Sequence, residues 1–156
     1  MATETADGRY KFADVFYGHE LSEWVIITHK EMARLSGWEY KPLVPGMFGY
    51  DNQAHSVAMA LTGFKWGMNR DHVASLVHDG WVVNYTYWRD NKPWESRPSV
   101  YFAPAKPLGD ETRNNCASLT YHNLPQSEKD KDLMIADVLL HELATKDPSG
   151  YRTNFT

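Results

Sequence analysis

The spacing of apolar residues first predicts a helix near the N-terminus. Apolar side chains recur every three or four residues from Leu21 to Leu35, and Gly37 follows where a helix end favours glycine. We therefore expect a helix over about 19–35. The segment 37–50 is rich in Pro, Gly and aromatic residues, which is typical of an ordered, turn-rich loop.

Two further helices are expected before the middle of the chain. A short one fits between Asp51, as its N-cap, and Gly63, which would end it. Asn69 is placed to cap a longer helix over 70–88, in which Gly80 would allow a neighbouring backbone to approach closely. The apolar stripe expected on this helix consists of Val73, Leu76, Val77 and Trp81.

The second half of the chain predicts one long connection and one helix. Residues 89–126 contain many Pro, Asn and Ser residues, and only 100–103 resembles a strand. A final helix is expected over about 126–145, with Ser127 capping the amide of Asp130. Its predicted core stripe is Leu133, Ala136, Leu139, Leu140 and Leu143, and its predicted solvent face carries Glu128, Lys129, Lys131 and Asp137. Asp130 and Asp132 fall on different faces, which argues against a shared-proton pair.

Together these elements predict a mainly α fold. We expect a compact bundle of about four helices with ordered aromatic-rich loops and at most a small β-hairpin. With 156 residues and 42% apolar content, the chain is expected to form a single domain over 1–156, with an ordered core over about 12–146 and loose ends.

Composition and charge narrow the class of partner. The net charge is −4 and no segment concentrates Lys and Arg, so double-stranded nucleic acid is not an expected partner. No apolar run approaches the roughly 20 residues that span a bilayer, so no membrane association is expected. The single cysteine, Cys116, cannot form an internal disulfide, and the N-terminus has no apolar signal stretch. A cytoplasmic protein is the resulting expectation.

Motifs for metal or nucleophilic chemistry are missing from the sequence. Segments 19–22 and 141–145 begin like a zinc-protease helix, but neither has a second His four residues after the first. No G-x-S-x-G elbow, phosphate loop or dinucleotide fingerprint occurs. We therefore expect no metal, no cofactor and no catalytic residue.

One catalytic alternative stays open, because the chain contains seven His residues. A small hydrolase could pair a histidine with an acid such as Asp71 or Asp79. The candidate histidines are His72, His78 and His122.

Aromatic and cationic residues indicate ligand binding more than catalysis. Six Trp and nine Tyr exceed what a core of this size needs. Flat rings stack on planar groups and cations neutralise phosphates, so this mixture favours a nucleotide or a nucleotide-like ligand. Trp24 and Trp81 are better explained as core. The candidate binding residues are Trp38, Tyr40, Lys41, Arg70, Trp88, Arg89, Trp94 and Arg97.

Particular segments resemble a known family. Gly37-Trp38-Glu39-Tyr40-Lys41-Pro42 is similar to the G-W-x-Y-G-P element of the ryanodine-receptor repeat (RyR) domain, with Lys at the usual Gly position. The segment 121–132, from Tyr121 through Leu124-Pro125 to Asp132, resembles the second element of that family, and His72–His78 with Trp94-Glu95 resembles phage members more loosely.

The resemblance implies a ligand-binding role and no chemistry. It implies a stand-alone module of bacterial or phage type that holds a nucleotide-derived or cyclic-nucleotide signal, and it adds Tyr121 to the candidate site. A phage member could sequester such a signal and so counter host immunity, acting in the host cytoplasm. The remaining alternative is an interaction or assembly protein, for instance a homo-oligomer that uses its exposed aromatic residues as the interface.

Overall fold

The structure is a computed structural model that describes residues 3–4, 9–91 and 108–146. Within these residues the chain is mainly helical, which confirms the predicted fold class. The helices are α1 (Leu21–Ser36), α2 (Phe48–Gly63), α3 (Arg70–Asn91), α4 (Glu111–Ala117), the 3₁₀ turn η2 (Tyr121–Asn123) and α5 (Gln126–Ala144). Two short antiparallel pairs precede them: β1 (Thr3–Glu4) with β2 (Tyr10–Lys11), and β3 (Val15–Phe16) with β4 (His19–Glu20).

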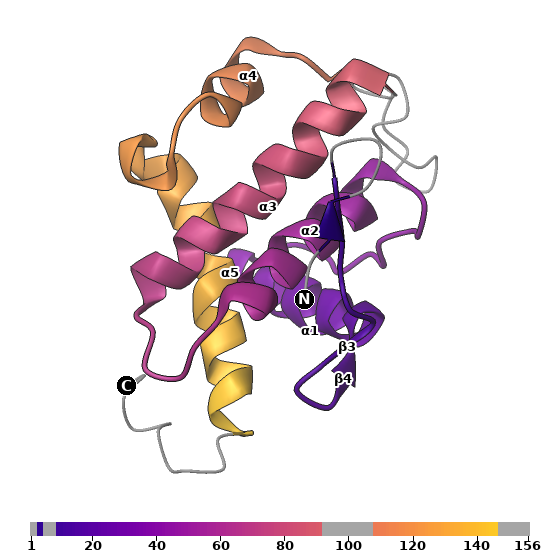
Figure 1. The fold of residues 1–156 in the computed structure, drawn as a ribbon, viewed down its shortest axis with the longest axis vertical. Helices are drawn as coiled ribbons and strands as arrows, with labels where there is room; N and C mark the ends of the chain where they lie inside the picture. The colour runs from indigo at the N-terminus through magenta and orange to yellow at the C-terminus, as the bar shows by residue number, and fades with distance from the viewer. Residues whose placement is uncertain (1–2, 5–8, 92–107, 147–156) are drawn as a thin grey trace.

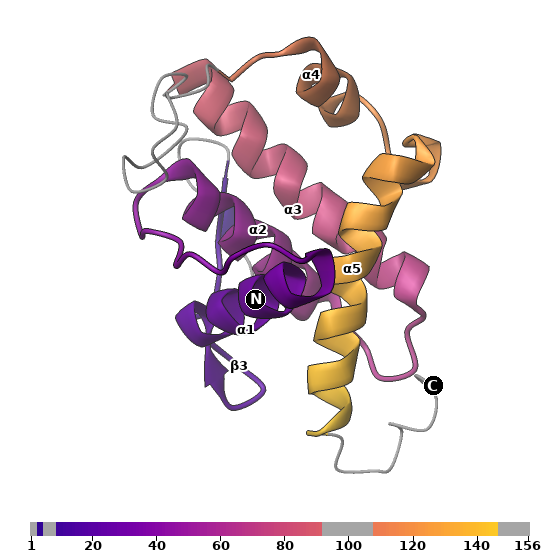
Figure 2. The ribbon, with the colours of Figure 1, turned by 180° about the vertical axis from the view of Figure 1, so that it is seen from behind.

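The long helix α3 organises the packing. It runs diagonally across the face seen in Figure 1, and both α2 and α5 pack against it. Helix α1 packs against α2 and α5 and completes the bundle, as the view from behind shows (Figure 2). The core lies among these four helices, with Trp24, Val57, Val77 and Leu139 fully buried. None of the helices in the described ranges is both long and apolar enough to cross a membrane.

Helix α1 begins and ends for local reasons. Glu20 and Glu23 form a reciprocal capping box, and Gly37 ends the helix with a positive φ of 77°. The expected helix is therefore confirmed, with its start at Leu21. The Trp24 indole donates to the Phe16 carbonyl at 2.9 Å, which ties the β3–β4 hairpin to this helix.

The predicted cap of α2 is wrong. The helix starts at Phe48, so Asp51 lies in its first turn. The Asp51 carboxylate instead accepts hydrogen bonds from the Trp88 indole at 3.2 Å and from Arg9 at 3.3 Å. A tertiary contact with α3 thus replaces the local capping role that the sequence suggested.

The contact between α2 and α3 depends on Gly80. A Cβ atom at this position would lie 2.2 Å from the His55 carbonyl oxygen, so only glycine allows this approach. The expected close packing is confirmed. Asn69 also caps α3 as predicted, because its Oδ1 accepts the His72 amide at 2.8 Å. Val73 and Val77 are fully buried, while Leu76 and Trp81 pack against the core from its edge.

Helix α5 follows its predicted pattern except at its start. All five residues of the predicted core stripe are buried. Ser127 does not cap the helix, because α5 begins one residue earlier, at Gln126, with Pro125 as its N-cap. The Pro125 carbonyl accepts the amides of Glu128 and Lys129, each at 3.0 Å. Lys131 and Asp137 are exposed as expected, whereas Glu128 and Lys129 are half-buried.

The connection after α3 contains structure that the sequence did not predict. Helix α3 continues to Asn91, and α4 forms where only a loop was expected. Asp110 caps α4 by accepting the Arg113 amide at 3.0 Å. The strand expected at 100–103 lies outside the described residues.

Candidate functional site

A cavity of about 260 Å³, here called the polar cavity, opens among the helices. Its wall combines polar and charged side chains with the ring of Trp81 and a few apolar residues. The polar and charged members used below are Asn52 from α2, His78 from α3, Arg113 and Cys116 from α4, and Glu128, Lys131 and Asp132 from α5.

A histidine and an acid meet at the inner part of this wall. Nδ1 of His78 lies 3.6 Å from Oδ2 of Asp132, and their side chains are only 3% and 13% exposed. Nε2 of His78 lies 2.7 Å from the Leu119 carbonyl oxygen, so Nε2 carries a proton and donates it there. Burial and, to a smaller extent, the charge of Glu128 raise the pKa of Asp132 to about 7, while Lys131 opposes the rise.

The acceptor capacity of Asp132 is unfilled. At 3.6 Å, the contact with His78 is too long for a good hydrogen bond. Among the residues that the structure describes, no group donates a hydrogen bond to this carboxylate. Nearby, Oδ1 of Asn52 is also buried without a hydrogen-bond partner in the described chain. The wall therefore presents hydrogen-bond acceptors that no donor in the described chain fills.

Aromatic rings form one side of the cavity. The His78 and Trp81 rings are stacked, with centroids 5.9 Å apart and planes 16° apart. Trp81 in turn stacks on Tyr85 at 4.8 Å and 5°. This column keeps the Trp81 indole in a fixed orientation beside the His78–Asp132 pair.

Two cations line the cavity at its more exposed end. The side chains of Arg113 and Lys131 are 25% and 68% exposed. Each has a carboxylate partner: Arg113 contacts Asp110 at 2.6 Å, and Lys131 contacts Glu128 at 3.1 Å. The wall therefore combines a largely buried carboxyl and imidazole with a half-buried Arg113 and an exposed Lys131.

The geometry disfavours nucleophilic chemistry at this site. Burial raises the pKa of the Cys116 thiol, which suppresses the reactive thiolate. In a nucleophile–His–acid arrangement the imidazole nitrogen opposite the acid receives the proton of the nucleophile. In His78 that nitrogen, Nε2, already donates to the Leu119 carbonyl. No group of His, Cys, Asp and Glu residues suited to a metal occurs in the described ranges.

The sequence-predicted binding residues are distributed over separate places, and the first group lies at the corner after α1. Trp38 is 52% exposed there, and Tyr40 is half-buried. Tyr40 lines a second cavity of about 390 Å³ between α1 and the following loop, here called the α1 cavity. The His29 ring lies 5.4 Å from that of Tyr40 and 6.3 Å from that of Trp38. Lys41 is half-buried on the same loop.

Arg70 and Tyr121 form a second group, which joins α3, η2 and α5. Arg70 makes a two-point contact with Asp137, at 2.8 Å and 2.6 Å. The buried Tyr121 donates its hydroxyl to Asp71 at 2.9 Å. Burial and this hydrogen bond raise the pKa of Tyr121 to about 12. Both predicted residues therefore have structural partners.

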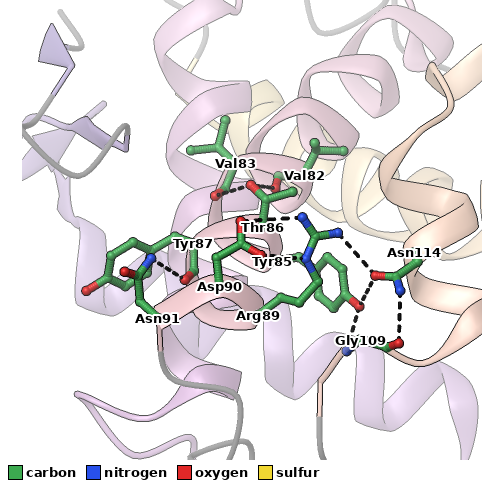
Figure 3. Close-up of polar contacts among 10 residues, drawn as sticks. All are labelled: Val82, Val83, Tyr85, Thr86, Tyr87, Arg89, Asp90, Asn91, Gly109 and Asn114. Carbon is green, nitrogen blue, oxygen red and sulfur yellow. Dashed lines mark hydrogen bonds and ion pairs between the residues drawn. The ribbon is translucent and has the colours of Figure 1, made fainter.

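The remaining predicted residues lie at or beyond the end of α3. Trp88 is fully buried and presents no ring face at the surface. Figure 3 shows Arg89 between Asp90 and Asn114, with its nitrogens 2.9 Å and 3.1 Å from their side-chain oxygens. Trp94 and Arg97 lie outside the described residues.

None of the described ligand-binding candidates from the sequence lines the polar cavity. The sequence indicated His78 only as a possible catalytic residue. It indicated Asp132 only as the neighbour of Asp130, on a different helix face that prevents the two acids from sharing a proton. The partnership of His78 with Asp132 joins two helices that are distant in sequence, so no local pattern could reveal it. Arg113 belongs to the unpredicted helix α4, for which the Asp110 cap was the only available signal.

Comparison with known proteins adds no relative. Neither a family model, nor a curated protein, nor a solved structure matches the chain. The resemblance to the RyR domain therefore stays a prediction.

Proposed function

We propose that this chain is a non-enzymatic module that binds a small nucleotide-derived molecule in the polar cavity. One observation carries the proposal: a single cavity combines a largely buried acid that has no hydrogen-bond donor in the described chain, an aromatic ring and two cations. Ligand sites usually have such a wall, with a few convergent polar groups that fix orientation. The resemblance to nucleotide-binding modules supports the same ligand class.

The order of the groups suits a base that enters first and a phosphate that stays outside. Asp132 and the Trp81 column are positioned to contact the base, and Arg113 and Lys131 to contact the phosphate. To bind a phosphate, Arg113 and Lys131 must leave or share their carboxylate partners, Asp110 and Glu128. The phosphate therefore contributes less affinity than it would at unpaired cations. A cavity of about 260 Å³ is just below the range of roughly 300–1,000 Å³ for drug-sized ligands. It therefore favours a mononucleotide-sized ligand, or one part of a larger molecule.

A thermal-shift screen followed by calorimetry tests this proposal. The panel contains nucleoside monophosphates, ADP-ribose and cyclic dinucleotides. A true ligand raises Tm at micromolar concentration, because it binds only the folded state. Arg113→Gln should weaken binding several-fold, whereas Arg34→Gln, which alters an exposed cation paired with Glu31 on α1, should not. Mass spectrometry should recover the ligand intact; a hydrolysed product, or a panel without any shift, contradicts the proposal.

A second candidate function is assembly through apolar side chains of α1 and of the loop that follows it. Ile26 and Leu35 are exposed on α1, and Trp38 and Val44 are exposed on the loop. Such a group indicates a protein interface when it forms one patch. We propose that these side chains join copies of the chain into a homo-oligomer. Light scattering of the wild type and of Trp38→Ala separates the candidates, since a monomeric wild type excludes assembly and leaves ligand binding untouched.

A further inference from the structure

We infer that the ligand of the polar cavity presents two adjacent N–H groups to the carboxylate of Asp132, as the Watson–Crick edge of guanine does. The ligand class is then a guanine nucleotide, or a signal that contains guanine. This inference rests on the proposed function and specifies it further. It starts from the one acidic side chain on the cavity wall that is both largely buried and without a hydrogen-bond donor in the described chain.

The first step concerns what Asp132 requires. An ionised carboxylate has two oxygens and accepts hydrogen bonds without donating any. Glu128, the other acid on this wall, already accepts from Lys131 at 3.1 Å. Asp132 makes one ion-pair contact in the described chain, with His78 at 3.6 Å from one of its oxygens, and accepts no hydrogen bond there. The cavity thus holds a carboxylate whose natural complement is a ligand with hydrogen-bond donors.

The second step distinguishes the bases. The edge of guanine has N1–H and the N2 amino group side by side, so both can donate to the two oxygens of one carboxylate. The corresponding edge of adenine has one amino donor and one lone pair on N1. That lone pair would face a carboxylate oxygen and be repelled. The ionised form of Asp132 therefore selects guanine and rejects adenine, by attraction and by repulsion together.

The third step concerns the charges that face Asp132. These groups are His78 on α3, Glu128 and Lys131 on α5, Cys116 on α4 and Tyr121 on η2, while Arg113 of α4 lines the same cavity. The guanine edge requires the ionised acid, whose pKa is about 7 in the free protein. Guanine binding should therefore strengthen as the pH rises from 6 to 8, while protonation of the acid at lower pH would suit adenine.

Calorimetry with GMP, AMP and XMP tests the inference on the full chain. At pH 8 we expect wild type to bind GMP at least tenfold more tightly than AMP. Asp132→Asn should weaken GMP binding at least tenfold and strengthen XMP binding, because xanthine replaces the N2 donor by a carbonyl that the new amide can pair with. Asp137→Asn is the matched control, since Asp137 is an exposed acid on the same helix and contacts Arg70 away from the cavity.

The outcomes separate the two claims. If GMP and AMP bind within threefold of each other and Asp132→Asn changes neither, the inference is overturned while the proposed function stands. If no nucleotide binds to wild type, both are overturned. A thermal melt of Asp132→Asn confirms that the variant is folded, and the wild-type comparison of GMP with AMP at pH 6 and pH 8 decides the question without any variant.

Discussion

The carboxylate of Asp132 on α5 lies 3.6 Å from Nδ1 of His78 on α3, at the wall of the polar cavity. Two ionisable groups that are nearly buried thus face each other while only the imidazole has a firm second partner, the Leu119 carbonyl. Burial without full hydrogen bonding costs free energy of folding. The pair is therefore a place where the free energy of unfolding depends on pH.

Replacing Asp132 by Asn should stabilise the protein at pH 8. The rise of the pKa of Asp132 from its ordinary value of 3.8 to about 7 corresponds to about 4 kcal/mol. The folded state holds this proton more tightly, so the wild type loses stability as the pH rises from about 4 to about 7. Since Asn imitates the neutral acid, we expect a gain of about 2–4 kcal/mol at pH 8 and little change near pH 4. Urea denaturation at both pH values measures it.

A loss of stability in Asp132→Asn at pH 8 would contradict this expectation. It would mean that the ion pair with His78 outweighs the cost of burying the charge. Asp137→Asn again serves as the control, because its exposed contact with Arg70 predicts a change below about 1 kcal/mol at either pH.

Gly80→Ala should destabilise the fold. The added Cβ would lie 2.2 Å from the His55 carbonyl oxygen, so α2 and α3 must separate. Overpacking of this kind costs about 1–3 kcal/mol, more than the roughly 1 kcal/mol that alanine gains in helix propensity. Gly63→Ala is the comparison, because its Cβ would meet the end of the Leu76 side chain at 2.8 Å, which can rotate away. Thermal unfolding in which Gly80→Ala is the more stable of the two variants would refute this account of the packing.

Asn114 should control how firmly α4 is attached to α3. Its Oδ1 accepts from the Tyr85 hydroxyl and from Arg89, and its Nδ2 donates to the Gly109 carbonyl at 2.9 Å (Figure 3). Asn114→Ala removes all three contacts, so we expect a loss of about 1–3 kcal/mol and faster amide exchange in α4. Hydrogen exchange with mass spectrometry measures this change, and the exposed neighbour Asn115 supplies the control, Asn115→Ala. Equal exchange in both variants would show that the network does not hold α4.

Tyr121→Phe and Arg70→Ala should lower the free energy of unfolding by different amounts. The Tyr121 hydroxyl is part of a mostly buried side chain and donates to Asp71, so its removal should cost about 1 kcal/mol. The Arg70 contact with Asp137 is half-exposed and screened by solvent, so its loss should cost about 0.5 kcal/mol or less. Denaturation at low and high salt provides the check, because only the Arg70 contribution should fall as salt rises.

The sequence predicted most of the helices because their signals are local. The stripe of α5, the Asn69 cap and the end of α1 at Gly37 all depend on residues within a few positions of one another. The two caps that were predicted wrongly, Asp51 and Ser127, failed for different reasons. Asp51 has a tertiary partner on α3, and Ser127 lies inside the first turn of α5, which begins at Gln126 with Pro125 as its N-cap.

The candidate site could not be predicted in the same way. Ring and charge types favoured Trp88 and Arg89, and the resemblance to the RyR domain favoured Tyr121. Packing buries Trp88 and Tyr121, and Asn114 and Asp90 engage Arg89. The polar cavity combines residues from helices that are far apart in sequence, and only the crossing of α3 and α5 places His78 beside Asp132. The sequence by itself thus determined, through helical periodicity, which faces of the helices are apolar. The distances between polar groups on different helices depend on how those faces pack. Only the tertiary structure decided these distances.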